Sequence, residues 1–132
     1  MRESSLPFLT FEVEATPAGA ERAAQRLSAF AADHRVAPTV GRIVGPVAGD
    51  VVRILAGALG DAVPAHVQVE ADIAEHDLQV VIACAGDDAR PARMPALRRR
   101  LVEVGRRCDG FGVERAGVAG VQVWCCFRLR DA

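Results

Sequence analysis

The sequence holds four cysteines and three histidines, the residue types that most often bind metals or act as nucleophiles and bases. The cysteines are Cys84, Cys108, Cys125 and Cys126; none forms a Cys-x-x-Cys pair or has a histidine nearby at ligand spacing. Cys125 and Cys126 are neighbours in an expected strand, so their side chains point to opposite faces of the sheet. We therefore predict buried, reduced thiols and no metal or redox site.

The histidines do not indicate nucleophilic catalysis. His34, His66 and His76 are scattered among polar neighbours, and none has a Ser or Cys partner in a recognisable motif. We expect no metal and no catalytic residue of this kind.

The composition is that of one folded domain. The 132 residues are 51% hydrophobic and 25% charged, which is typical of a globular protein with a single core. No apolar run approaches the ~20 residues that a membrane helix needs, and residues 1–10 lack the long apolar stretch of a signal peptide. All sixteen basic residues are arginine and the net charge is −1. We predict one domain over residues 1–132, encoded by a GC-rich bacterial genome, cytoplasmic, with no membrane or nucleic-acid partner.

Hydrophobic periodicity predicts the elements that must position these residues. Thr16 before Pro17 is a favourable helix start, with Thr as N-cap and Pro at the first helical position. A second helix begins near Pro38, although Gly41, Gly45 and Gly49 weaken it. Apolar spacing indicates a third helix over residues 97–108. Alternation predicts strands at residues 9–15, 67–73, 78–85, 111–115 and 121–130.

The resulting order is β-α-α-β-β-α-β-β. Its hairpins and one-sided alternation predict an α+β two-layer sandwich, with a mixed, mostly antiparallel sheet and three helices on one face. The other face is left to water or to a partner.

Trp124 lies on the face of the last strand opposite the apolar stripe, near Arg128. Two interpretations remain open. An exposed Trp on a strand is a common interface anchor, whereas the N-terminal residues 6–8 (Leu-Pro-Phe) would otherwise cover it. Acidic residues on the outer face beside Arg128 and Arg130, and the arginines of the third helix, are interpreted as ordinary solvated surface. The residues concerned are Glu12, Glu14, Glu70, Asp72, Arg98, Arg99, Arg100, Arg106 and Arg107.

The element order resembles that of the Bergerat-fold ATPases of the GHKL superfamily, specifically the small bacterial anti-sigma factors that are also serine kinases. The resemblance covers nearly the whole chain. It is carried by residues 50–54 (DVVRI), 84–86 (CAG) and 120–124 (GVQVW). It implies a histidine-kinase-ATPase-like domain whose partner is a sigma factor or an anti-sigma-factor antagonist.

The positions that hold magnesium and ATP in that family differ here. On the second helix, Asp50 takes the place of the family's general-base Glu and is the only candidate base. Ile54 takes the place of the magnesium-binding Asn and has no oxygen for a hard cation. Shifting the register by one aligns Gly49 and Arg53, which is no better.

The adenine and phosphate positions differ as well. In the family's Asp-x-Gly motif, Cys84 replaces the Asp that accepts from adenine, while Gly86 is kept. Asp87 or Asp88 would substitute only after a bulge. The short stretch that follows contains Arg90 and Arg93, and it meets the third helix at Pro95, which supplies no N–H to a phosphate cradle.

The sequence therefore predicts a pseudo-ATPase without cofactor, acting as a nucleotide-independent regulatory binding module like an anti-sigma factor. Trp124 and Arg128 are its candidate interface residues. Two alternatives stay open: an active ATP-dependent serine kinase with relocated ligands, and a structural subunit that forms a homodimer through the open sheet face.

Overall fold

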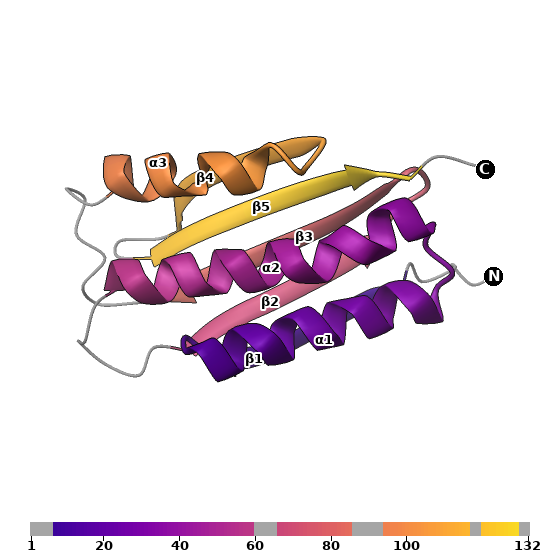
Figure 1. Ribbon diagram of the computed structural model, residues 1–132, viewed down its shortest axis with the longest axis horizontal. Coiled ribbons are helices and arrows are strands. Elements are labelled where there is room, and N and C mark those ends of the chain that lie inside the picture. Colours follow the sequence, from indigo (N-terminus) through magenta and orange to yellow (C-terminus); the bar gives the residue numbers. More distant parts are fainter. Residues whose placement is uncertain (1–6, 60–65, 86–93, 117–119, 130–132) are drawn as a thin grey trace.

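A computed structural model of the chain describes residues 7–59, 66–85, 94–116 and 120–129. The predicted fold class and element order are confirmed (Figure 1). None of the helices in these ranges has the length and apolar character needed to cross a bilayer. The elements are β1 (Phe8–Glu14), α1 (Pro17–Asp33), α2 (Pro38–Leu59), β2 (His66–Ile73), β3 (Asp77–Ala85), α3 (Met94–Gly105), β4 (Gly110–Ala116) and β5 (Gly120–Arg128).

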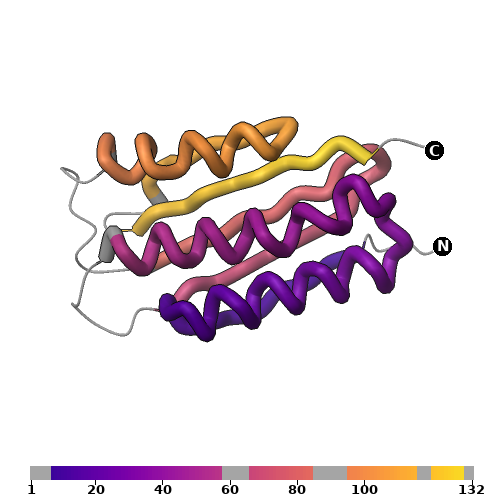
Figure 2. Tube along the Cα trace, viewed as in Figure 1, coloured from indigo at the N-terminus to yellow at the C-terminus, as the bar shows by residue number. Residues whose placement is uncertain are grey.

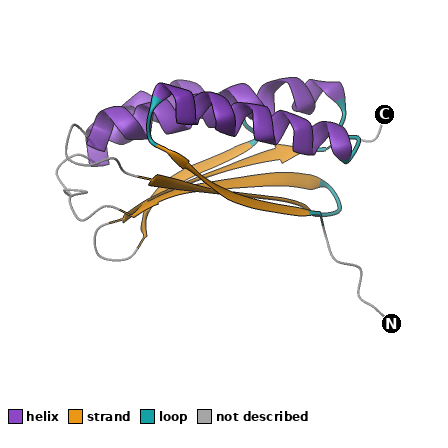
Figure 3. Cartoon of the chain, turned by 90° about the horizontal axis from the view of Figure 1, so that it is seen from below, coloured by secondary structure: helices purple, strands orange, loops and turns teal. Residues whose placement is uncertain are grey.

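The strands form one five-stranded sheet in the order β1-β2-β3-β5-β4. Every described pairing is antiparallel, so no parallel pair of a mixed sheet occurs among these strands. The three helices lie on one side of the sheet (Figure 3), and α2 runs between α1 and α3 (Figure 2). The arrangement places β1 and β4 at opposite edges of the sheet.

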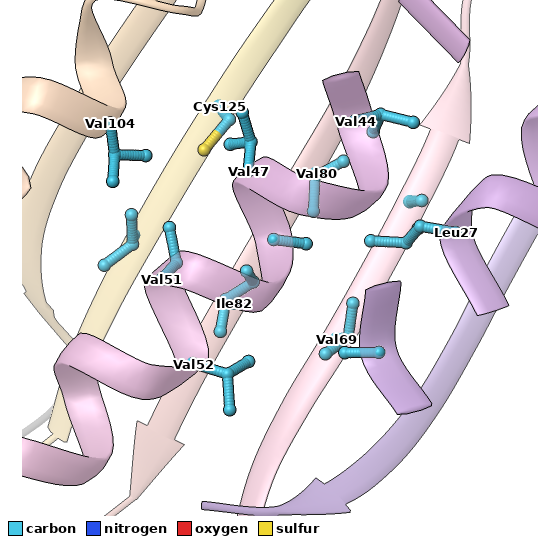
Figure 4. Packing of buried hydrophobic residues seen from close by; sticks show 14 of the residues in the cluster. Leu27, Val44, Val47, Val51, Val52, Val69, Val80, Ile82, Val104 and Cys125 are labelled. Atoms are coloured by element: carbon cyan, nitrogen blue, oxygen red, sulfur yellow. The ribbon is translucent and has the colours of Figure 1, made fainter. Parts of the chain in front are cut away.

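The core lies between the helices and the inner face of the sheet. Valine dominates it, because alternate positions of the central strands point toward the apolar stripe of α2 (Figure 4). No polar or charged side chain of the described residues is buried. The largest fully buried side chains are Phe127, Leu27, Leu55, Leu78, Ile82 and Leu101.

The start of α1 follows the predicted capping pattern. Thr16 has an extended backbone, and its hydroxyl accepts a hydrogen bond from the Gly19 backbone N–H at 3.0 Å. Pro17 follows at the first turn, where its missing N–H has no helical partner to lose. The strand-to-helix corner is therefore fixed by local sequence.

The glycines of α2 have a packing role that periodicity alone does not predict. A Cβ on Gly45 would overlap the Ser28 hydroxyl and the Ala24 carbonyl of α1, and a Cβ on Gly49 would lie 3.2 Å from the Ala20 carbonyl oxygen. The helix continues unbroken for 22 residues, Pro46 included. The glycines thus let the two backbones approach closely, and packing against α1 compensates for their low helix propensity.

Candidate functional site

The face of α2 that meets α3 carries the residues aligned with the family's magnesium-binding positions. Asp50, Ile54 and Gly57 recur at spacings of four and three residues, which puts them on one side of the helix. Arg107, in the turn that follows α3, contacts Asp50, and the Arg100 guanidinium of α3 lies 3.0 Å from where a Gly57 Cβ would be. The two helices are therefore antiparallel neighbours along this face.

Asp50, the candidate base, is tied to two arginines. Its Oδ1 accepts from Arg53 Nη1 at 3.1 Å, and its Oδ2 accepts from Arg107 Nη2 at 2.5 Å. The side chain is 38% exposed. The second contact joins the middle of α2 to the end of α3, so the carboxylate has a structural use here, and both of its oxygens already accept hydrogen bonds.

Ile54 lies one turn further along the same face. It is half-buried and packs against the hydrophobic core. A hydrocarbon side chain cannot ligate Mg²⁺, which takes oxygen ligands. The residues present at this face do not fit the bridging metal of the ATPases that the sequence resembles.

Cys84 lies on the inner face of β3, near the end of the strand, and is the first residue of the 84–86 triplet. It pairs with Val67 on β2 and Val121 on β5, and it is only 2% exposed. Burial raises the pKa of the Cys84 thiol, which keeps it neutral. A neutral thiol is a weak acceptor, so this position does not fit the adenine amino group either.

The remaining predicted nucleotide positions are only partly described. Pro95 is the second residue of α3 and is exposed, in the first turn, where proline is tolerated. Gly86 and the alternatives Asp87, Asp88, Arg90 and Arg93 lie outside the described residues.

Trp124 lies on the outer face of the sheet and packs across the edge strand β4. A Cβ on Gly112 would overlap its indole, and a Cβ on Gly110 would lie 3.4 Å from the ring. Trp124 is half-buried. The missing Cβ atoms of these two glycines therefore let one side of the indole lie directly against the backbone of β4.

The N-terminal residues do not cover Trp124 as far as they are described. Pro7 precedes β1 and Phe8 opens it, and β2 and β3 separate β1 from β5. Phe8 is itself 58% exposed, while Leu6 lies outside the described residues. The covered interpretation of Trp124 is thus wrong for Pro7 and Phe8.

Arg128 is exposed, and its backbone N–H donates to the Asp109 carboxylate at 2.6 Å. The prediction that the acidic residues of β1 and β2 lie beside Arg128 on the outer face is wrong. Strand β3 separates them from β5, and Asp77 of β3 is the residue opposite Arg128. Arg130 lies outside the described residues.

The arginines of α3 and of the turn after it are exposed, as the sequence predicts. Some of them also make surface contacts: Arg106 pairs with Glu103 at 3.0 Å, Arg107 binds Asp50, and the Arg100 guanidinium lies beside Gly57. Arg98 and Arg99 are exposed.

Sequence reasoning missed two features. A surface groove of about 550 Å³ runs between α1 and α2. Cys108 packs against the buried core that includes Cys125, and the two side chains shift each other's pKa in opposite directions. The glycine spacing of α2 was a usable signal for the groove, whereas the thiols are distant in sequence and meet only through the fold. The groove is lined by Glu21, Ala24, Gln25, Ser28, Pro46, Gly49, Asp50 and Arg53.

The prediction of four buried thiols is therefore correct for only two of them. Cys84 and Cys125 are buried, whereas Cys108 and Cys126 are half-buried. All four are free cysteines.

No protein-family model matches the chain, and comparison with curated proteins finds no match. Among solved structures, the chain is similar to the crystal structure of the RsbU and RsbW domains of Rv1364c from Mycobacterium tuberculosis, with a TM-score of 0.70 and 18% sequence identity. The match covers 96% of this chain and 34% of that one. The chain thus spans about a third of its structural neighbour, and at this identity the likeness is one of fold.

Proposed function

We propose that this chain is a nucleotide-independent regulatory domain of the anti-sigma-factor type, which binds a protein partner without ATP. The fold neighbour, which contains an RsbW domain, supports the first half of the proposal. It agrees with the resemblance to anti-sigma kinases found in the sequence. In this proposal the chain is a single domain with the architecture of the anti-sigma kinases and with altered nucleotide-binding positions.

The observation that carries the proposal is that Ile54 and Cys84 occupy the two positions where the resemblance places the metal-binding and adenine-binding residues. At the position of the metal-binding residue, Ile54 packs against the core, and at the adenine-binding position Cys84 is 2% exposed among valines. An adenine edge left without its acceptor costs about 1–3 kcal/mol, roughly one to two decades in affinity. Loss of the metal ligand acts in the same direction, so physiological nucleotide does not occupy the domain.

Thermal unfolding with and without millimolar Mg²⁺-ATP tests this directly. A ligand at 100 times its dissociation constant adds about 2.7 kcal/mol to the free energy of unfolding, which raises the midpoint by several degrees in a domain of this size. We expect no rise. A rise of several degrees would contradict the proposal and favour the active serine kinase. ADP and Mg²⁺ alone serve as controls.

The outer face of the sheet is the proposed partner surface. No described helix covers it (Figure 3), and it presents the half-buried Trp124 indole with Arg128 on the same strand. Trp and Arg are the residue types that most often dominate binding energy at protein interfaces. The proposed partner is a sigma factor or an anti-sigma-factor antagonist.

Affinity isolation from the source organism, with bound proteins identified by mass spectrometry, tests the partner class. We expect a sigma factor or an antagonist to be retained without added nucleotide and to be lost with Trp124→Ala. Gln122→Ala is the matched control, because Gln122 lies on the same strand and face and is also half-buried. Equal retention by both variants would remove Trp124 from the interface.

The same open face supports the homodimer as a second candidate. Solution mass measured for the parent and for Trp124→Ala distinguishes the two. A dimer that dissociates with Trp124→Ala, but not with Gln122→Ala, supports self-association, whereas a parent that is already monomeric rules it out.

A further inference from the structure

The turn between α3 and β4 folds back against β5 and brings two cysteines together. The Asp109 backbone N–H donates to the Cys126 carbonyl at 2.9 Å, and Cys108 N–H donates to the Gly105 carbonyl at 3.1 Å. From Gly110 onward, β4 pairs with β5, with Gly110 opposite Cys126. This backbone pattern brings the turn that carries Cys108 against the part of β5 that holds Cys125 and Cys126, which lie 17 and 18 residues further along the chain (125 − 108 = 17 and 126 − 108 = 18).

Both side chains lie on the inner side of the sheet, where Cys108 packs against the buried core that includes Cys125. Cys125 belongs to the buried face of β5, close to Val104 of α3 (Figure 4). Cys108 Sγ also lies 3.5 Å from the Val104 carbonyl oxygen, to which it donates. The other two cysteines are placed elsewhere, since Cys126 points to the outer face and Cys84 lies at the far end of β3 beside Val121.

The pair is chemically unequal. Cys125 is 1% exposed, whereas Cys108 is only half-buried. The hydrogen bond from Cys125 lowers the pKa of Cys108 despite its partial burial, with help from the nearby Arg107 and against Asp109. The same hydrogen bond and burial raise the pKa of Cys125. Cys108 is therefore the better thiolate, and thiolates are the form that oxidants attack.

We propose that Cys108 and Cys125 form a reversible disulfide when the protein meets a hydroperoxide, with Cys108 as the thiol oxidised first and Cys125 as the resolving thiol. This modification site is independent of the proposed partner binding.

The chemistry needs only a hydroperoxide, ROOH. The Cys108 thiolate attacks the terminal oxygen, a sulfur–oxygen bond forms, the O–O bond breaks, and the alkoxide leaves and is protonated to ROH. Cys125 then attacks the Cys108 sulfenic acid, the S–S bond forms, and the hydroxyl group leaves with the Cys125 proton as water. Two thiols are oxidised as the peroxide is reduced, and a small dithiol reverses the reaction by exchange.

The bond would join the end of α3 covalently to β5. Arg107 precedes Cys108 and binds Asp50, so the crosslink also holds the α2–α3 contact in place.

The test uses the full chain treated with hydrogen peroxide, denatured, alkylated with iodoacetamide and digested with trypsin. We expect the intact mass to fall by two hydrogen atoms and two of the four thiols to become resistant to alkylation until a dithiol is added. The linked peptides should be residues 108–115 and 116–128, because arginines precede and end both. The second peptide contains both Cys125 and Cys126, so variants must separate them.

Cys126→Ser is the matched control and should still form the link, as should Cys84→Ala. Cys125→Ala should lose the link and accumulate two added oxygen atoms on Cys108, because the sulfenic acid then lacks its resolving partner. Circular dichroism before treatment establishes that each variant is folded. Four thiols that stay free in the treated parent, or a link that Cys126→Ser abolishes, would overturn the proposal.

Discussion

The two sides of α2 pack against their neighbouring helices in different ways. Toward α1, a Cβ on Gly45 would meet backbone and a short side chain, so no added atom fits without moving a helix. Toward α3, a Cβ on Gly57 meets only the flexible end of Arg100, and Asp50 is held by the end of Arg107. On the α1 side the backbones of the two helices lie close together, whereas on the α3 side the contacts are made by long side chains that can rearrange.

This difference explains which part of the molecule tolerates functional change. The α3 side is where the resemblance places the magnesium-binding residue, and here it carries Ile54. The α1 side sets the spacing of the helix layer over the sheet. A change among the long, flexible side chains on the α3 side is therefore expected to cost little stability, whereas a change on the α1 side is expected to alter the fold itself.

The largest expected effect comes from comparing one substitution at two positions. Gly45→Ala should lower the free energy of unfolding by about 2 kcal/mol, because overpacking against α1 outweighs the gain in helix propensity. Gly57→Ala should raise it by about 0.5–1 kcal/mol, since Arg100 can move aside. Urea denaturation of the two variants and the parent measures both. Similar values would remove the distinction between the faces.

Ile54→Asn introduces the amide found at this position in the ATPases that the sequence resembles, and it tests whether residue 54 supports the core. We expect a loss of about 1–2 kcal/mol, because a half-buried apolar contact is replaced by an amide without a described partner. Ile54→Val, which keeps the hydrocarbon, should cost about 0.5 kcal/mol. If the asparagine variant is as stable as the parent in urea, Ile54 does not support the core.

The buried thiol of Cys84 predicts a pH dependence. Its pKa is raised above the ordinary 9.0 by burial, so above that pH the unfolded chain loses a proton that the folded protein keeps. Stability is then present below the ordinary pKa and falls as pH rises, at up to about 1.4 kcal/mol per pH unit. As the pH rises from about 8 to 10, Cys84→Ala should therefore lose less of its free energy of unfolding than the parent does. Parallel curves for parent and variant would contradict this assignment.

Asp50→Ala has the smallest expected effect. Its ion pairs are largely exposed, so their loss should cost about 0.5 kcal/mol and less at high salt. Arg106→Ala, which breaks the exposed pair with Glu103 on α3, is the control and should cost no more. A loss well above 1 kcal/mol for Asp50→Ala in urea would show that the α2–α3 face depends on this carboxylate.

The elements were predictable because local rules agree with the fold. Thr16 and Pro17 begin α1 through hydrogen bonding and a fixed φ, and alternation identifies the strands because one face of the sheet is buried. Periodicity predicts that the third helix reaches Cys108 and the last strand residue 130. In the structure these elements end at Gly105 and Arg128. The end of a helix depends on the following turn, here held by contacts with β5, and those contacts do not appear in local periodicity.

The sequence alone determined the order of elements, the inner and outer faces of the strands, and the absence of an oxygen ligand at residue 54, because these follow from side-chain type and short-range spacing. Only the tertiary structure decided which glycines of α2 contact α1, which glycines of β4 pack against the Trp124 indole, and that Cys108 lies near Cys125. Each of these depends on the strand order β3-β5-β4 or on the packing of helices over it, and such long-range geometry leaves no periodic trace in the chain.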